Sequence, residues 1–141
     1  MKKSLKRKYA KLLVKQGVNI QKGQQLNISA DVEAAEFVAL LVEEAYRAGA
    51  GYVRVDWSMT QTTKLAYRHC SMKTLCDVPD WQVERARHDS EILPARIALL
   101  SQDPDALASA NPEKIARASI AASKKLKPFR EAMENKHQWL V

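Results

Sequence analysis

The residue types that most often bind metals or act as nucleophiles are few and scattered in this sequence. Metal sites need such side chains at close, regular spacing, for example two histidines one helical turn apart. His88 and His137 have no second ligand at that spacing. His69 and Cys70 are adjacent, so they point in different directions on a helix, and Cys70 and Cys76 lack the CxxC spacing. The sequence therefore predicts free thiols and no metal-binding or catalytic residue.

Paired carboxylates and glycine-rich loops also give no clear site. Glu43 and Glu44 are adjacent in a predicted helix and are expected to face apart, whereas Glu33 and Glu36 share a helix face. Acid–base catalysis requires such groups to be desolvated in a cleft, so solvated helix positions are the favoured interpretation. The four glycines form no GxGxxG or P-loop motif, which disfavours cofactor binding of the nucleotide type.

Three residues at strand ends are the candidate site residues that the sequence offers. In open α/β sheets, ligands collect at the carboxyl ends of the strands. Asp31 follows the first predicted strand, and Asp56 and Trp57 end the second. They are candidates for an entrance wall that faces a further domain. Each also has a simpler interpretation: a helix cap for Asp31, a loop acid for Asp56, and a core or interface anchor for Trp57.

Helical and strand patterns alternate along the chain and must position these residues. In order, the patterns predict a helix over 3–16, a strand over 25–30, a helix ending near 48, a strand over 52–57, helices over 60–70 and 81–92, a strand over 95–100, a helical turn after Asp103-Pro104, a long helix from Pro112, and the opening of a fourth strand at 138–141. These elements predict an α/β fold with an open, mainly parallel sheet of about four strands and flanking helices. This is Rossmann-like layering without a nucleotide motif, in a single domain over 1–141.

Local signals predict how several elements end. Gly17 and Gly49 are expected to stop the first two helices, with Gly17 in a left-handed conformation, and Lys22-Gly23 forms a turn. Residues 71–79 are expected to be irregular, and Leu65, Ala66 and His69 to face inward. Pro128 predicts a kink or break of the last helix near Lys124.

The net charge of +7 comes from one short segment. Residues 1–30 hold eight basic residues and no acid, so the remaining chain has 15 basic and 16 acidic residues. Basic clusters occur in proteins that bind nucleic acid or membranes. In the helix over 3–16, however, the predicted inward face leaves the lysines on a solvated face and exposes no aromatic ring to stack on bases. That inward face consists of Leu5, Tyr9, Leu12, Leu13 and Gln16. No nucleic acid and no membrane is therefore expected as a partner.

The two ends of the sequence indicate where in the cell the protein is found and whether the chain is part of a longer polypeptide. No apolar run approaches the ~20 residues of a membrane-spanning helix, and the basic start is not followed by the apolar core of a secretory signal. We expect a cytoplasmic protein. A final strand that begins at 138–141 would leave an unpaired edge, so the chain is expected to be part of a longer polypeptide.

Four ordered segments resemble the thermophilic-type metallo-aminopeptidases, the family of aminopeptidase T, aminopeptidase S and PepS. They read YAKLLVKQGVNIQKGQ at 9–24, EAYRAGA followed by VRVDW within 44–57, DPDAL at 103–107 and KHQWLV at 136–141. No single segment is a chemical motif, but the ordered set is specific and the resemblance spans essentially all 141 residues.

The resemblance implies that this chain is the non-catalytic amino-terminal domain of a two-domain enzyme that removes amino-terminal residues from peptides. Family members are similar in having a carboxy-terminal domain that binds two divalent metal ions of the zinc, cobalt or magnesium class. None of the family's metal-ligand motifs falls within 1–141. The resemblance further implies a homodimer that encloses the active-site space, with this domain acting as scaffold, in active-site access and in dimer contact. Alone, the chain is expected to be inactive.

Two other hypotheses remain open. The chain could be a stand-alone binding module that uses its basic first helix on nucleic acid or anionic surfaces, in which case binding must weaken steeply with salt. It could also be a complete, small flavodoxin-like domain that acts as an interaction partner.

Overall fold

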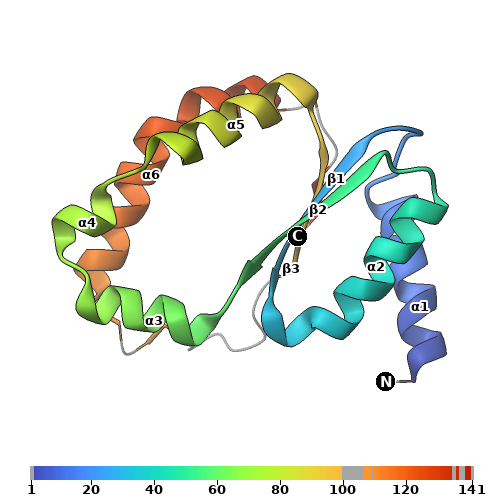
Figure 1. Cartoon of the computed structure of the whole chain (residues 1–141), viewed down its shortest axis with the longest axis horizontal. Helices are drawn as coiled ribbons and strands as arrows, with labels where there is room; N and C mark the ends of the chain where they lie inside the picture. Colours follow the sequence, from blue (N-terminus) through green and yellow to red (C-terminus); the bar gives the residue numbers. More distant parts are fainter. Residues whose placement is uncertain (1, 100–106, 109, 135, 137–138, 141) are drawn as a thin grey trace. The chain divides into compact units, whose positions relative to one another are not determined.

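The computed structural model describes residues 2–99, 107–108, 110–134, 136 and 139–140 (Figure 1). They belong to two compact units. Unit 1 combines Met1–Met59 with Leu93–Ser101 and His137–Val141, and unit 2 combines Thr60–Ile92 with Gln102–Lys136. The chain passes between the units more than once, and the assignment of 1–141 to a single domain stays a prediction.

Unit 1 contains an open, parallel β-sheet. Its strands are β1 (Gln25–Asp31), β2 (Tyr52–Ser58), β3 (Ala95–Leu99) and the two-residue β4 (Trp139–Leu140), in the order β2-β1-β3-β4. All three strand pairs are parallel. The predicted α/β class with a mainly parallel sheet of about four strands is therefore confirmed.

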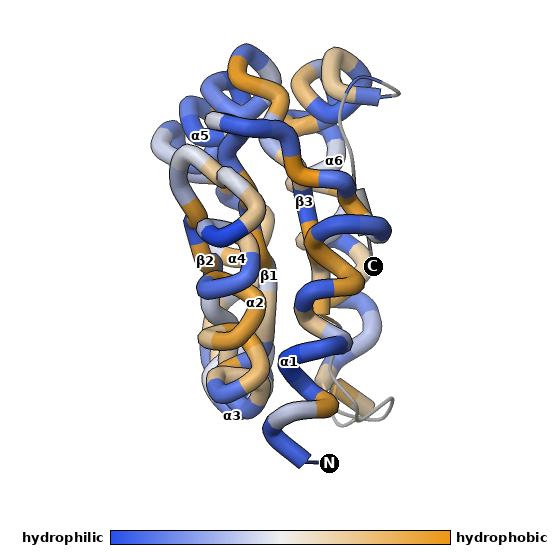
Figure 2. The backbone as a smooth tube through the Cα atoms, turned by 90° about the vertical axis from the view of Figure 1, so that its right-hand side faces the viewer, coloured by the Kyte–Doolittle hydropathy of each residue, from blue (hydrophilic) through white to orange (hydrophobic). Residues whose placement is uncertain are grey.

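Two helices of unit 1 pack on the apolar face of this sheet. They are α1 (Lys3–Leu12), continued by the π-helical segment η1 (Leu13–Gly17), and α2 (Ala35–Arg47), which follows the 3-10 turn η2 (Val32–Ala34). In Figure 2 the tubes of α1 and α2 alternate between hydrophilic and hydrophobic colours, as amphipathic helices do. Their inner side chains join the strands in one core that includes Ala10, Val14, Leu41, Leu26, Ile28 and Ile97.

Glycines bring the beginnings of β1 and β2 together. Gly23 has a φ of 81° and Gly49 a φ of 105°, the left-handed region that glycine occupies without strain. The Gly23 amide donates to the Gly49 carbonyl at 2.7 Å, and the Gly51 amide donates to the Gln24 carbonyl at 2.8 Å. The predicted turn at Lys22-Gly23 and the predicted end of α2 at Gly49 are both confirmed.

The predicted inward face of the first helix is wrong except at Leu13, which packs against the core. Leu5, Tyr9 and Leu12 are 55%, 50% and 48% exposed, whereas Ala10 and Val14 on the opposite side of the helix are fully buried. The helix has two apolar stripes, and the stripe of small side chains faces the core because it allows a close approach to α2. Gly17 is also not left-handed; the left-handed residue after η1 is Asn19, with a φ of 50°.

Unit 2 consists of helices in its described part. They are α3 (Thr60–His69), α4 (Met72–Cys76), α5 (Asp80–Ile92) and α6 (Pro112–Met133), and both α4 and α5 pack on α6. Asn111 caps α6 through its Oδ1, which accepts from the Glu113 amide at 2.9 Å. The predicted start of the long helix is therefore confirmed, whereas the predicted turn at Asp103-Pro104 lies outside the described residues.

Two local predictions for unit 2 are wrong, and the break that was one of the two outcomes predicted for Pro128 is not present. The 71–79 segment contains α4, because the Ser71 hydroxyl caps the Thr74 amide at 3.2 Å. Leu65 and His69 are exposed rather than inward. Pro128 does not break α6, which runs to Met133. Pro128 and Lys124 are exposed, so water can satisfy the Lys124 carbonyl that the proline leaves without a donor.

Candidate functional site

Strand alternation gives the sheet of unit 1 one apolar and one polar face. Asn27 of β1 is paired in register with Arg54 of β2 and with Arg96 of β3, and Ser29 is paired with Asp56. Residues that are paired in register point to the same side of a sheet. The polar face therefore carries a row of two arginines that flank an asparagine, with an aspartate one step further along β2.

Two of the contacts on the polar face involve Arg54, Asp56 and Asn27. Arg54 Nη2 lies 3.3 Å from Asp56 Oδ2, and Gln25 Nε2 donates to Asn27 Oδ1 at 2.8 Å. Asn27 is only 4% exposed, and Arg54 and Asp56 are partly buried. Such an arrangement can bind and orient a polar or charged group.

The structure places the three predicted site residues on different faces. Asp56 lies on the polar face, and Asp31, two positions beyond Ser29, lies on the same face at the carboxyl edge. Asp31 also caps the following helical turn, because its Oδ1 accepts from the Glu33 amide at 3.0 Å. Trp57 alternates to the apolar face, where it pairs with Ala30 and is 48% exposed. The role of all three in an entrance wall stays a prediction.

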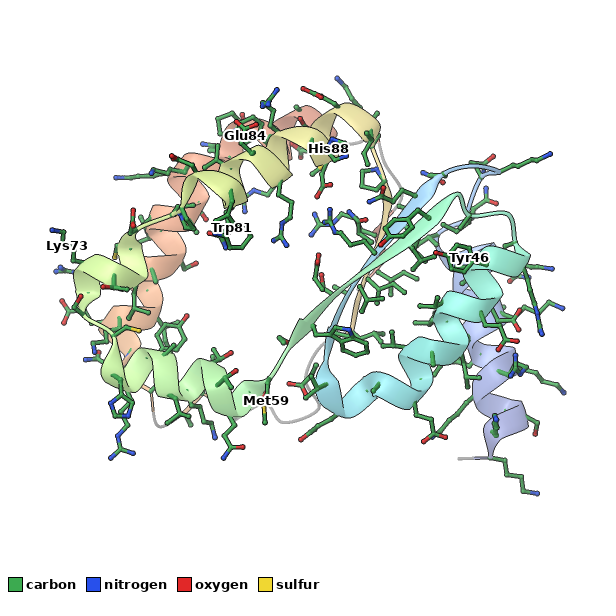
Figure 3. All side chains as sticks on the ribbon, viewed as in Figure 1. Tyr46, Met59, Lys73, Trp81, Glu84 and His88 are labelled. Carbon is green, nitrogen blue, oxygen red and sulfur yellow. The ribbon has the colours of Figure 1, made fainter. Side chains whose placement is uncertain are left out.

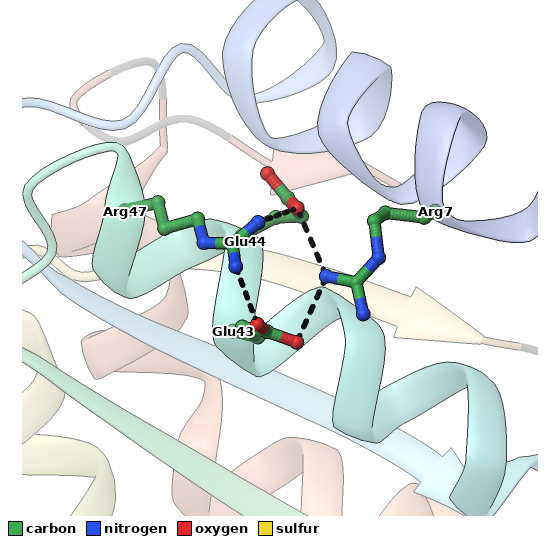
Figure 4. A network of polar contacts seen from close by, with 4 residues as sticks. All are labelled: Arg7, Glu43, Glu44 and Arg47. Carbon is green, nitrogen blue, oxygen red and sulfur yellow. Dashed lines mark hydrogen bonds and ion pairs between the residues drawn. The ribbon is translucent and has the colours of Figure 1, made fainter. Parts of the chain in front are cut away.

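A network of four charged side chains joins α1 to α2 (Figure 4). Arg7 Nη1 lies 2.9 Å from Glu43 Oε2 and 3.4 Å from Glu44 Oε1. Arg47 reaches the same two carboxylates, at 2.7 Å for Glu43 and 3.1 Å for Glu44. Glu43 and Glu44 therefore do not face apart as predicted, because both converge on the same pair of guanidinium groups.

The network shifts the pKa values of Glu43 and Arg7. The hydrogen bond from Arg7 holds the pKa of Glu43 below its ordinary value, and the hydrogen bond to Glu43 raises the pKa of Arg7. On α5 the Arg87 guanidinium likewise lowers the pKa of Glu84 through a hydrogen bond. Shifts of this direction keep carboxylates charged, which suits ion pairing rather than general acid catalysis at neutral pH.

The residue types that could hold metal ions do not gather in the described part of the chain. His69 and His88 are exposed on α3 and α5, where Figure 3 labels His88 and Glu84, and His137 lies outside the described residues. Cys70 and Cys76 are free and half-buried. Among the described residues no three His, Cys, Asp or Glu side chains are grouped to bind a metal. The two divalent ions that the resemblance implies thus do not fit a site among these residues.

Sequence reasoning missed the polar face and the arginine network. The alternation of polar and apolar residues in QLNISAD and YVRVDWS was a signal for Asn27 and Arg54. Glu43 and Arg47 stand at i and i+4, which favours an ion pair on a helix. The participation of Arg7 had no local signal, because it lies 36 residues from Glu43.

These features define a class of protein: an α/β domain with a parallel sheet, a helix layer on its apolar face and a polar face suited to binding. Residues 2–141 match the family model of the thermophilic metalloproteases (M29), and the chain belongs to this family. The resemblance found in the sequence is therefore confirmed.

Individual relatives are similar over almost the whole chain. Aminopeptidase PepS of Streptococcus thermophilus is 37% identical over 135 residues, which are 95% of this chain and 33% of the relative. Aminopeptidase T of Thermus thermophilus is 34% identical over 126 residues, 89% of this chain and 31% of the relative. The solved structure of wild-type AmpT from Thermus thermophilus superimposes with a TM-score of 0.86 at 33% identity, covering 99% of this chain and 36% of that one. The chain thus spans about a third of the length of these relatives.

The helices of the described residues fall short of what a membrane-spanning helix requires. No helix there combines the length and apolar character that crossing a bilayer requires.

Proposed function

We propose that this chain is the amino-terminal, non-catalytic domain of a metal-dependent aminopeptidase that removes amino-terminal residues from peptides. One observation carries the proposal: the family match occupies residues 2–141 while the chain accounts for about a third of each relative. Aminopeptidase is the activity in the relatives' names. In the intact enzyme, two divalent metal ions held by the remaining polypeptide would activate water and polarise the scissile carbonyl.

The domain would act as a scaffold, with a role in active-site access and in dimer contact. The outer stripe of α1, formed by Leu5, Tyr9 and Leu12, is the feature that supports a contact role. Their spacing of i, i+4 and i+7 places them along one side of the helix. Leu5 and Leu12 face away from the buried Ala10 and Val14, whereas the half-exposed Tyr9 lies at the margin of the stripe, where its ring stacks on Phe37 of α2 with the ring centroids 5.9 Å apart. A helix that is apolar on two sides suits burial on both.

We assign this outer stripe to contact with the carboxy-terminal catalytic domain of the same polypeptide. Lysines surround the stripe, so a second copy of α1 on it would bring like charges together. The homodimer and a cytoplasmic location belong to the same proposal. The polar face of the sheet would contribute polar groups, including Asp56, to the access path.

The contact role is tested by changing Leu5, Tyr9 and Leu12 to serine in the intact enzyme. We expect the hydrolysis of an aminoacyl nitroanilide to fall by roughly tenfold or more, since an apolar interface of three side chains is lost. The same changes in residues 1–141 alone should leave the helical circular dichroism signal in place, because these side chains are half exposed there.

A matched control changes Val32, Ile92 and Ile120 to serine, which are exposed apolar residues elsewhere on the chain. The control should retain activity. If the stripe variant were as active as the control, the contact role would be wrong.

A further inference from the structure

A pocket of about 590 Å³ lies within unit 2, between α3 and the first turn of α6. This volume is within the range of small-molecule sites. Helix α3 contributes one face at i, i+3, i+4 and i+7, and the start of α6 supplies the other wall. The lining residues are Gln61, Lys64, Leu65, Tyr67, Arg68, Ala110, Asn111 and Lys114.

Among the described residues, the charge of the lining is positive. Lys64 and Arg68 stand one helical turn apart on α3, Lys114 stands on α6, and the described lining residues include no aspartate or glutamate. Within the described residues neither Lys64 nor Arg68 forms an ion pair, in contrast to Arg87 and Arg117, which pair on their own helices. Like charges that share a concave wall raise the local potential and attract an anion.

Lys114 is held in place by α3. Its Nζ donates to the Tyr67 carbonyl at 3.1 Å and to the Cys70 carbonyl at 2.8 Å. An ammonium group has three donors, so one N–H remains after these two bonds. Asn111 uses its Oδ1 on the Glu113 and Lys114 amides, which leaves its NH₂ group as a donor on the pocket wall.

The pocket also offers apolar and aromatic surface next to these donors. Leu65 lies beside Arg68 on the same face of α3, and Tyr67 is half-buried. A ligand that fits both features carries an oxyanion at one end and a short apolar group at the other.

We propose that this pocket binds a small oxyanion, a carboxylate or phosphate group, through Lys64, Arg68 and the remaining donor of Lys114. The pocket is formed by other residues than the polar sheet face and the stripe on α1, and its proposed role does not depend on the peptidase assignment.

The test is a titration of the ¹⁵N-labelled 141-residue chain followed by two-dimensional NMR. The probes are inorganic phosphate, N-acetyl-leucine and N-acetyl-leucinamide. The last two differ in the carboxylate alone, so they isolate the charge. We expect saturable shifts of the backbone amide signals of 61–68, 110–111 and 113–114 with phosphate or N-acetyl-leucine, and none with N-acetyl-leucinamide. The tighter of the two anions identifies the ligand class.

Two double variants with the same change of charge complete the test. Lys64→Gln with Arg68→Gln should weaken binding by at least about tenfold, as expected for the loss of charge-assisted hydrogen bonds. Lys73→Gln with Arg130→Gln, at exposed positions outside the lining, should leave the affinity unchanged. If the first variant lost its helical signal, Arg68→Gln alone would replace it.

The proposal is overturned by any of three results. These are the absence of saturable shifts with both anions, equal affinity of the pocket variant and the control, and binding of the amide as tight as that of the acid.

Discussion

At the scale of single residues, the clearest structural device is the buried carboxylate of Glu44. It is 4% exposed, and two arginines, Arg7 of α1 and Arg47 of α2, compensate its charge. The free energy of unfolding falls when a buried charge loses its partners. It also falls when guanidinium groups lose the acceptor that they share. The four-residue network therefore stabilises the packing of α1 on α2 and helps to hold the outer stripe of α1 in a fixed orientation.

Replacing Glu44 with alanine should lower the free energy of unfolding by about 1–3 kcal/mol, because both arginines lose an acceptor in a partly buried position. Urea denaturation measures this change. The control is Glu131→Ala, whose pair with Lys127 is well exposed and should contribute less than about 1 kcal/mol. Equal losses in the two variants would contradict the structural role of Glu44.

The lowered pKa of Glu43 gives the network a pH dependence. A carboxylate whose pKa is lower in the folded state stabilises that state above its ordinary pKa, and this contribution is lost as the pH falls through the lowered value. In Glu43→Gln the urea midpoint should therefore fall less than in the wild type between about pH 6 and about pH 3. If the urea midpoint fell equally with pH in the two proteins, the protonation of Glu43 would not be coupled to folding.

Residue positions were predictable from the sequence where the signal is local. The cap at Asp31 and the turns at Gly23 and Gly49 need only neighbouring residues, and all three are present. The separation of Asp56 from Trp57 also follows from the two-residue period of a strand. The convergence of Arg7 on Glu43 and Glu44 was not predictable, since it depends on how two helices pack.

At the scale of elements, the start of the sheet depends on close contact between two glycines. A Cβ atom built on Gly51 would lie 2.4 Å from the Gly23 carbonyl oxygen. Gly51 does not have a left-handed backbone conformation. Glycine is needed at this position because there is no space for a side chain. This contact brings the first residues of β1 and β2 into register.

Replacing Gly51 with alanine should lower the free energy of unfolding by about 1–3 kcal/mol, because the backbone must shift to admit the methyl group. The matched control is Gly23→Ala, which meets no atom within 4 Å but requires a left-handed alanine. We expect about 1 kcal/mol for that variant. Denaturation curves that show the control to be the more damaging would contradict the packing argument.

The sequence predicted the order and class of the elements because strand and helix periodicities are local and strong. It did not predict which side of α1 is buried, since both sides are apolar and packing on α2 decides between them. It also missed α4, whose five residues are too few for a periodic pattern. The break at Pro128 was predicted because proline has a low helix propensity. The long helix α6 continues through it, since Pro128 is at an exposed position.

At the scale of the whole molecule, the chain matches about a third of the length of its relatives over nearly all of its own residues. Its described residues supply a parallel sheet, a polar face and an apolar helix stripe, and they group no metal ligands. Under the proposed function, other polypeptide carries out the hydrolysis and this chain is the α/β domain that accompanies it.

The most direct measurement is metal-dependent hydrolysis of leucyl-p-nitroanilide by two proteins, each assayed with added zinc or cobalt. One is the 141-residue chain alone, and the other is a chimera in which this chain replaces the matching third of a family member. We predict no turnover and no stoichiometric metal for the chain alone, and metal-dependent turnover for the chimera. Metal-dependent turnover by the chain alone, or a folded, metal-loaded chimera without activity, would contradict the account.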